Sequence, residues 1–198
     1  FTGITVDHNG IVYVVESHSG RIYQYSGDGV LLTVFGGKGN KKGMFSSPNS
    51  IAVDPSGNVY ISDFGLNSIH VFSPTSFILQ IHQALEAFQQ GNYDKALVHW
   101  DQVLNTCETY HLAFEQKGLI EYKAGEFDLS MQTYRLAINR DGYSRAFIKN
   151  RHNIIRENFT VITFVVVFAI AAIIYILKKF KKYSERNVDK LSEEGEIL

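Results

Sequence analysis

Residues 50–63 read SIAVDPSGNVYISD, and residues 3–16 carry nearly the same text, GITVDHNGIVYVVE. The shared positions stand 47 residues apart, as Asp7 and Asp54 do. A fixed period of this size indicates structural units that stack on one another. We therefore expect the N-terminal part of the chain to be built from a repeat.

Each unit predicts a small antiparallel sheet. In the first unit the runs GITVD, IVYVVE, RIYQYS and VLLTVFG are rich in β-branched and aromatic residues, and the turn sequences HNG, SHSG and SGDG separate them. Four short strands per unit, repeated along the chain, are typical of the blades of a β-propeller. The second unit offers only three strands before a helical pattern begins.

These two units resemble NHL repeats. The match is close in SIAVDPSGNVYISDFGLNSIHVF, residues 50–72, and looser in GITVDHNGIVYVVESHSGRIYQY, residues 3–25. The pattern departs at Glu16, where the repeat has a second Asp, and at Ser68, where it has Arg. The resemblance implies an all-β fold over residues 1–76, as two blades of an NHL-type β-propeller.

Two blades that lack one strand do not close a ring or bury both of their flat faces. Propellers with NHL repeats commonly have about six blades, so we expect the chain to be the C-terminal part of a longer protein. The alternative is that three copies associate to complete the ring.

A second repeat follows, with a period of 34 residues. QALEAFQQGNYDKALVHWDQVL recurs as QKGLIEYKAGEFDLSMQTYRLAI, with apolar residues at helical spacing and a glycine at each central turn, Gly91 and Gly125. This pattern resembles tetratricopeptide repeats and implies two α-helical hairpins over residues 77–142. The candidates for partner contact, expected to act mainly in packing, are Tyr93, Trp100, Tyr122 and Tyr134.

The segment FTVITFVVVFAIAAIIYIL, residues 159–177, contains no charge and has the length of a transmembrane helix. Residues 143–158 are expected to cap the helical repeats and couple them to this span. No Gly or Pro occurs between Gly142 and Gly195, which predicts one continuous helix from about residue 143 to residue 177. Residues 178–198 are basic and then mixed in charge, and we expect them to form a disordered tail.

Basic residues are more frequent after the apolar segment than before it, which favours a cytoplasmic C-terminus and extracytoplasmic N-terminal domains. The membrane-flanking residues, expected to contact lipid headgroups, are Arg156, Lys178, Lys179, Lys181 and Lys182. If the chain is complete, the alternative is a tail-anchored protein whose domains lie in the cytosol.

Chemistry-bearing motifs are sparse. Asp7, Glu16, Asp54 and Asp63 could suggest a metal site, but they occupy repeat positions where hydrogen bonds to turns are the commoner role. The sequence predicts no catalytic residue, cofactor or metal. The net charge of −1 does not favour nucleic acid as a partner.

The complete order of segments resembles membrane proteins of Gram-positive bacteria that occur beside sugar-type ABC transporter permeases and multi-span Yip1-like proteins. The resemblance implies a cell-membrane, single-pass scaffold for protein–protein interaction, as an accessory subunit of a transport-type complex with other membrane proteins. The alternative is a propeller hydrolase of the lactonase kind, or a ligand sensor, with its site in upstream blades.

Overall fold

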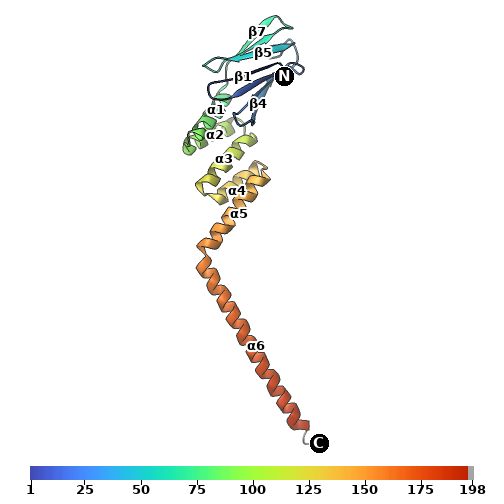
Figure 1. Ribbon diagram of the computed structural model, residues 1–198, viewed down its shortest axis with the longest axis vertical. Coiled ribbons are helices and arrows are strands. Elements are labelled where there is room, and N and C mark those ends of the chain that lie inside the picture. Colours follow the sequence, from blue (N-terminus) through green and yellow to red (C-terminus); the bar gives the residue numbers. More distant parts are fainter. Residues whose placement is uncertain (196–198) are drawn as a thin grey trace. The chain divides into compact units, whose positions relative to one another are not determined.

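The computed structural model describes the backbone of residues 1–195 and the side chains of residues 1–179. The chain divides into two compact units, Phe1–Ser144 and Arg145–Leu198. Two small antiparallel sheets open the first unit and helices follow them, and the second unit is helical (Figure 1).

The first sheet has four strands in the order β1-β2-β3-β4, and the second has three in the order β5-β6-β7. All neighbouring strands are antiparallel. The strands are β1 (Gly3–Val6), β2 (Val12–Glu16), β3 (Arg21–Tyr25), β4 (Leu31–Gly36), β5 (Pro48–Val53), β6 (Val59–Asp63) and β7 (Ser68–Phe72). The four strands expected in the first unit and the three in the second are confirmed.

Repeated aspartates close the first hairpin of each sheet. Asp7 Oδ1 accepts hydrogen bonds from the backbone N–H groups of Asn9 and Ile11, both at 2.9 Å. Asp54 Oδ1 accepts the two equivalent bonds, also at 2.9 Å. A carboxylate that binds its own turn in this way selects the hairpin over other local conformations. The predicted role of these repeat carboxylates in turns is confirmed.

Asp63 holds the loop that enters the second sheet. Its buried carboxylate accepts backbone N–H bonds from Ser46 at 2.6 Å, Ser47 at 2.8 Å and Leu66 at 3.1 Å. Burial alone would raise the pKa of Asp63, but the backbone N–H groups outweigh it and hold the pKa below its usual value. The carboxylate therefore fastens the loop before β5 to the turn after β6.

Four helices follow, in two hairpins. They are α1 (Ser76–Gln89), α2 (Tyr93–Thr106), α3 (His111–Ala124) and α4 (Phe127–Leu136). Thr75 caps α1, with Oγ1 accepting from the N–H of Ile78. Gly91 and Gly125 take positive φ values of 74° and 86° between the paired helices, which confirms their predicted place in the turns.

Small residues let the helices of the second hairpin approach closely. Ser130 is fully buried in α4, and its hydroxyl donates a 2.8 Å bond to the carbonyl of Gly118 in α3. A Cβ on Gly118 would lie 3.0 Å from the ring of Tyr134, so the glycine makes room for that ring.

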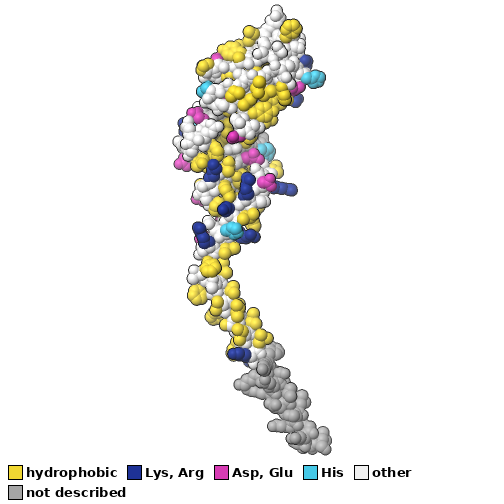
Figure 2. Space-filling model, viewed as in Figure 1, with side chains coloured by type: hydrophobic (Ala, Val, Ile, Leu, Met, Phe, Trp, Pro, Cys, Tyr) yellow, Lys and Arg dark blue, Asp and Glu magenta, His cyan; other side chains and the backbone are white. Residues whose placement is uncertain are grey.

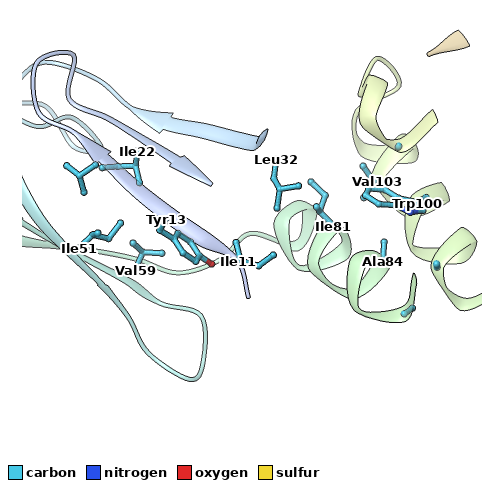
Figure 3. Close-up of a cluster of buried hydrophobic side chains, with 14 of the residues drawn as sticks. Ile11, Tyr13, Ile22, Leu32, Ile51, Val59, Ile81, Ala84, Trp100 and Val103 are labelled. Carbon is cyan, nitrogen blue, oxygen red and sulfur yellow. The ribbon is translucent and has the colours of Figure 1, made fainter. Parts of the chain in front are cut away.

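One cluster of buried hydrophobic residues runs from the sheets into the helices (Figure 3). The sheets contribute Tyr13 and Ile22, α1 contributes Ile81, and α2 contributes Trp100. The rings of Phe77 and Tyr110 pack edge to face at 5.3 Å beside this cluster. Within the first unit, the sheets thus share a core with α1, α2 and α3.

Two further helices end the chain, α5 (Arg140–Glu157) and α6 (Phe159–Gly195). The prediction of one uninterrupted helix from residue 143 to residue 177 is wrong, because the helix breaks at Asn158. The side-chain amide Nδ2 of Asn158 donates a 2.9 Å hydrogen bond to the Ile154 carbonyl, and the backbone N–H of Asn158 donates a 3.0 Å hydrogen bond to the same carbonyl. An asparagine that competes for backbone groups disfavours regular helix geometry.

α6 also continues to Gly195, where the sequence predicts a disordered tail. The segment after the apolar run is rich in Lys and Glu and has no Gly or Pro before Gly195, so helix propensity favours continuation. Residues 159–179 are long and apolar enough to cross a membrane.

Candidate functional site

Each sheet packs one face against the other sheet and exposes its second face. The exposed face of the first sheet uses positions that are buried in the second sheet: Ile4 is 69% exposed, and Ile51, 47 positions later, is 7% exposed. The opposite face of each sheet shows the reverse: Ile22 of the first sheet is 0% exposed, and its equivalent in the second sheet, Ile69, is 69% exposed. The two open faces therefore carry the two complementary halves of the interface that already joins the sheets.

These faces are apolar over several strands. Hydrophobic side chains gather on the surface of the sheet region in Figure 2. The open face of the first sheet includes Ile4, Val6, Val12, Val14, Tyr23 and Tyr25, and that of the second includes Ala52, Tyr60, Ile69 and Val71. Apolar strand surfaces of this kind are typical of sheets that are covered by another element.

A groove of about 600 Å³ lies among α2, α3 and α4. Its α2 wall carries residues at helical spacing, from Tyr93 to Asp101, and its α3 wall runs from Lys117 to Ala124. Lys117 of α3 forms an ion pair with Asp101 of α2 and joins the two walls. The lining of the groove also includes Asp94, Leu97, Ile120, Glu121, Glu126 and Leu129.

Glu121 is the unusual member of this groove. It is 7% exposed, and its Oε2 has no hydrogen-bond partner in the part of the chain that the structure describes. Burial raises the pKa of Glu121, while the Thr133 hydroxyl and the Lys117 ammonium act in the opposite direction. A buried carboxylate oxygen without a donor is energetically unfavourable, and such groups are normally paired.

The aromatic residues predicted for partner contact divide into two kinds. Trp100 and Tyr134 are buried in the helical core, where they pack as the sequence analysis expects of them in the main. Tyr93 and Tyr122 are half-buried, and their rings pack on Phe88 at 5.4 Å and Phe127 at 5.5 Å. Tyr93 is the one of the four that lines the groove.

The predicted membrane-flanking residues lie on the two terminal helices. Arg156 is exposed in α5, and Lys178 and Lys179 are exposed in α6. Lys181 and Lys182 also belong to α6, but their side chains lie outside those that the structure describes.

A further cavity, of about 310 Å³, lies between the two sheets and the start of α1. Phe35, Phe72 and Phe77 give it an aromatic lining, and Gln24 supplies a buried amide. The Gln24 Oε1 atom has no hydrogen-bond partner among the described residues. Across residues with described side chains, no group of three His, Cys, Asp or Glu residues could hold a metal ion.

Glu121 is not among the residues predicted for partner contact, although the helical repeat contains a signal for it. The position 34 residues earlier is Ala87, a buried residue of the first hairpin. A glutamate at a repeat position that is otherwise small, apolar and buried departs from the packing rule. Such a departure is a reason to look for a role in binding.

Comparison with known proteins gives one match within the chain. Residues 45–72 match the family model of the NHL repeat, which covers β5, β6 and β7 with the loop before them. No curated protein matches the chain. The chain thus contains an NHL repeat, at the second of the two units that the 47-residue period defines.

Proposed function

We propose that this chain is a membrane-anchored scaffold for protein–protein interaction. In this proposal the two sheets are blades of an NHL-type β-propeller and α1–α4 are two tetratricopeptide repeats. The NHL match at residues 45–72, the four-stranded first sheet and the 34-residue helical period support these assignments. The apolar segment of α6 supplies the membrane anchor.

The observation that carries the proposal is the equivalence of the open sheet faces to the buried interface between the sheets. Ile4 is exposed, whereas the equivalent residue of the second sheet, Ile51, is buried between the sheets. Ile69 is exposed, whereas the equivalent residue of the first sheet, Ile22, is buried there. A further sheet of the same repeat can therefore pack on either face by the existing contacts. Stacked repeats bury their faces in this way, and uncovered faces of this size are unfavourable in water.

The proposed orientation places the sheets and helices outside the cytoplasm and the C-terminus inside it. The lysines at the C-terminal end of the apolar segment, with Lys178 and Lys179 among them, support this by the positive-inside rule. Alkaline phosphatase fused after Gly142 should be active and the same fusion after Lys190 inactive. The opposite pattern would place the domains in the cytosol and overturn the orientation.

The partners we propose are other membrane proteins, a permease of the ABC type or a multi-span Yip1-like protein, as the sequence resemblance implies. The experiment is extraction of the tagged full-length protein from its native membrane in mild detergent, followed by mass spectrometry of proteins that elute in stoichiometric amounts. A multi-span membrane protein at fixed ratio is the expected result. Elution of the protein alone, or as an assembly of three copies of itself without another protein, would count against the accessory-subunit proposal.

A ligand sensor or propeller hydrolase is the second candidate. The cavity between the sheets and α1 favours it, because an unpaired amide oxygen in an aromatic cavity suits a small ligand with a hydrogen-bond donor. The same purified protein distinguishes the two candidates, since a sensor would retain a small molecule detectable by native mass spectrometry while lacking a stoichiometric partner.

A further inference from the structure

The groove among α2, α3 and α4 has a strong excess of negative charge. It is lined by the four carboxylates Asp94, Asp101, Glu121 and Glu126 and by one basic residue, Lys117. The Lys117 ammonium is already paired with Asp101. Four carboxylates of the groove lining therefore share one lysine, which leaves the lining with a net negative charge.

We propose that this groove binds a lysine or arginine side chain from a basic segment of a partner protein, with Glu121 as its principal charge partner. The inference rests on the proposed scaffold function and adds the chemistry of the segment that is recognised. Glu121 Oε2 is buried and has no donor among the described residues, so an incoming ammonium or guanidinium would supply the missing hydrogen bond.

The shape of the groove suits a long basic side chain. Leu97, Ile120 and Leu129 provide apolar wall, against which the methylene groups of lysine or arginine can pack. Asp94 and Glu126 are exposed, near the turns at which α2 and α4 begin, so they add attraction for a second basic residue of the same segment. An acidic or neutral segment without a donor at this position would leave Glu121 Oε2 buried without a hydrogen-bond partner and is disfavoured.

The ion pair between Lys117 and Asp101 determines where in the groove an incoming basic side chain binds. It joins α2 to α3 across the groove and already satisfies Asp101, which leaves Glu121 as the buried carboxylate for the incoming charge. Asp101, Lys117 and Glu121 all line the groove and alternate in charge. A basic side chain bound at Glu121 would add a further positive charge to this series.

The test is selection of random phage-displayed peptides on the full-length protein in detergent micelles, followed by affinity measurement with synthetic copies of the selected peptides. We expect the peptides to carry Lys or Arg and to bind the Glu121→Gln variant at least about tenfold more weakly, a loss typical of one charge-assisted contact. Replacement of the basic residue by glutamine in the peptide should cause a similar loss. Selected peptides without basic residues, or no selected peptides, would overturn the proposal.

Glu108→Gln is the matched control, because Glu108 is an exposed acid outside the groove and the substitution removes the same charge. Its affinity should stay within about twofold of the unchanged protein, as expected for a distant exposed charge. Basic peptides that bind Glu121→Gln as tightly as the unchanged protein would also overturn the inference. If the native partner still elutes with Glu121→Gln at full ratio, the scaffold function stands and the groove is not its site.

Discussion

The hydroxyl of Tyr110 donates a 2.8 Å hydrogen bond to the carbonyl of Leu32, and so ties the loop between α2 and α3 to strand β4. The two residues are far apart in the chain, and Tyr110 also packs on Phe77 at the start of α1. Burial is the main cause that raises the pKa of Tyr110, so the hydroxyl remains a hydrogen-bond donor over the physiological range. This bond joins the repeat that forms sheets to the repeat that forms helices.

Tyr110→Phe should lower the unfolding temperature of the first unit by about 3 °C, because one net hydrogen bond contributes about 1 kcal/mol. Fluorescence of Trp100, which is the single tryptophan and is buried, reports the unfolding of the helices. Tyr25→Phe, on the open face of the first sheet, is the matched control and should leave the midpoint unchanged. Equal midpoints for both variants would mean that the Tyr110 bond does not couple the two regions.

Asp63→Asn should destabilise the sheets by about 2 kcal/mol. The substitution replaces a carboxylate that accepts several backbone N–H bonds by a neutral amide, in which one of the two accepting oxygens becomes an NH2 donor. The pKa of Asp63 is held below its usual value, so its contribution is present above the ordinary aspartate pKa of about 3.9 and is lost as the pH falls through the lower folded value. The difference between the two proteins should therefore be largest near neutral pH and shrink in acid.

Chemical unfolding of Asp63→Asn and of the unchanged protein, followed by circular dichroism at a series of pH values, measures the difference in their stability. Asp28→Asn is the control, because Asp28 is an exposed turn residue and the same charge is removed. A constant difference between the Asp63 variant and the unchanged protein down to strong acid would contradict the assignment.

Much of the fold could be predicted from the two sequence periods. Equivalent turn residues such as Asp7 and Asp54 fixed the strands of both sheets, and Gly91 and Gly125 marked the turns of the helices. Local signals of this kind are readable because the residue and its hydrogen bonds are close together in the chain. The helix breaks at Asn158, where the side chain and the backbone N–H of this residue compete for the Ile154 carbonyl. The absence of Gly and Pro from the segment does not reveal such a competition.

The candidate site was less predictable. Trp100 and Tyr134 are candidates for partner contact that are expected to act mainly in packing, because large aromatic residues serve both in binding and in cores and only tertiary packing distinguishes the two uses. Glu121 lies on a helix that also has charged residues on its surface, so its burial depends on how α4 covers α3. A comparison with Ala87 across the repeat would have indicated it.

Glu121→Gln should flatten the dependence of stability on pH. Because burial raises the pKa of Glu121, its favourable contribution is present below the ordinary glutamate pKa and is lost as the pH rises through the higher folded value. The unchanged protein should therefore lose stability relative to the variant as the pH rises above the ordinary glutamate pKa. Trp100 fluorescence during thermal unfolding measures it, with Glu108→Gln as the control that keeps the slope of the unchanged protein. A Glu121 variant with that same slope would show that the carboxylate is ionised throughout.

Ile138→Asn should stabilise the protein, because Ile138 has a φ of 56° although its side chain is β-branched. It follows the end of α4, where the N–H of Asn139 donates to the Tyr134 carbonyl at 3.0 Å, and this helix-ending geometry favours glycine or asparagine. The side chain is 75% exposed, so its removal sacrifices little packing.

Relief of the left-handed strain at Ile138 should contribute about 1 kcal/mol to stability, which raises the unfolding midpoint by about 3 °C. Leu136→Asn, at an exposed position with helical backbone, should instead lower the midpoint slightly. If both asparagine variants shift the midpoint downward, the positive φ at Ile138 is not a source of strain.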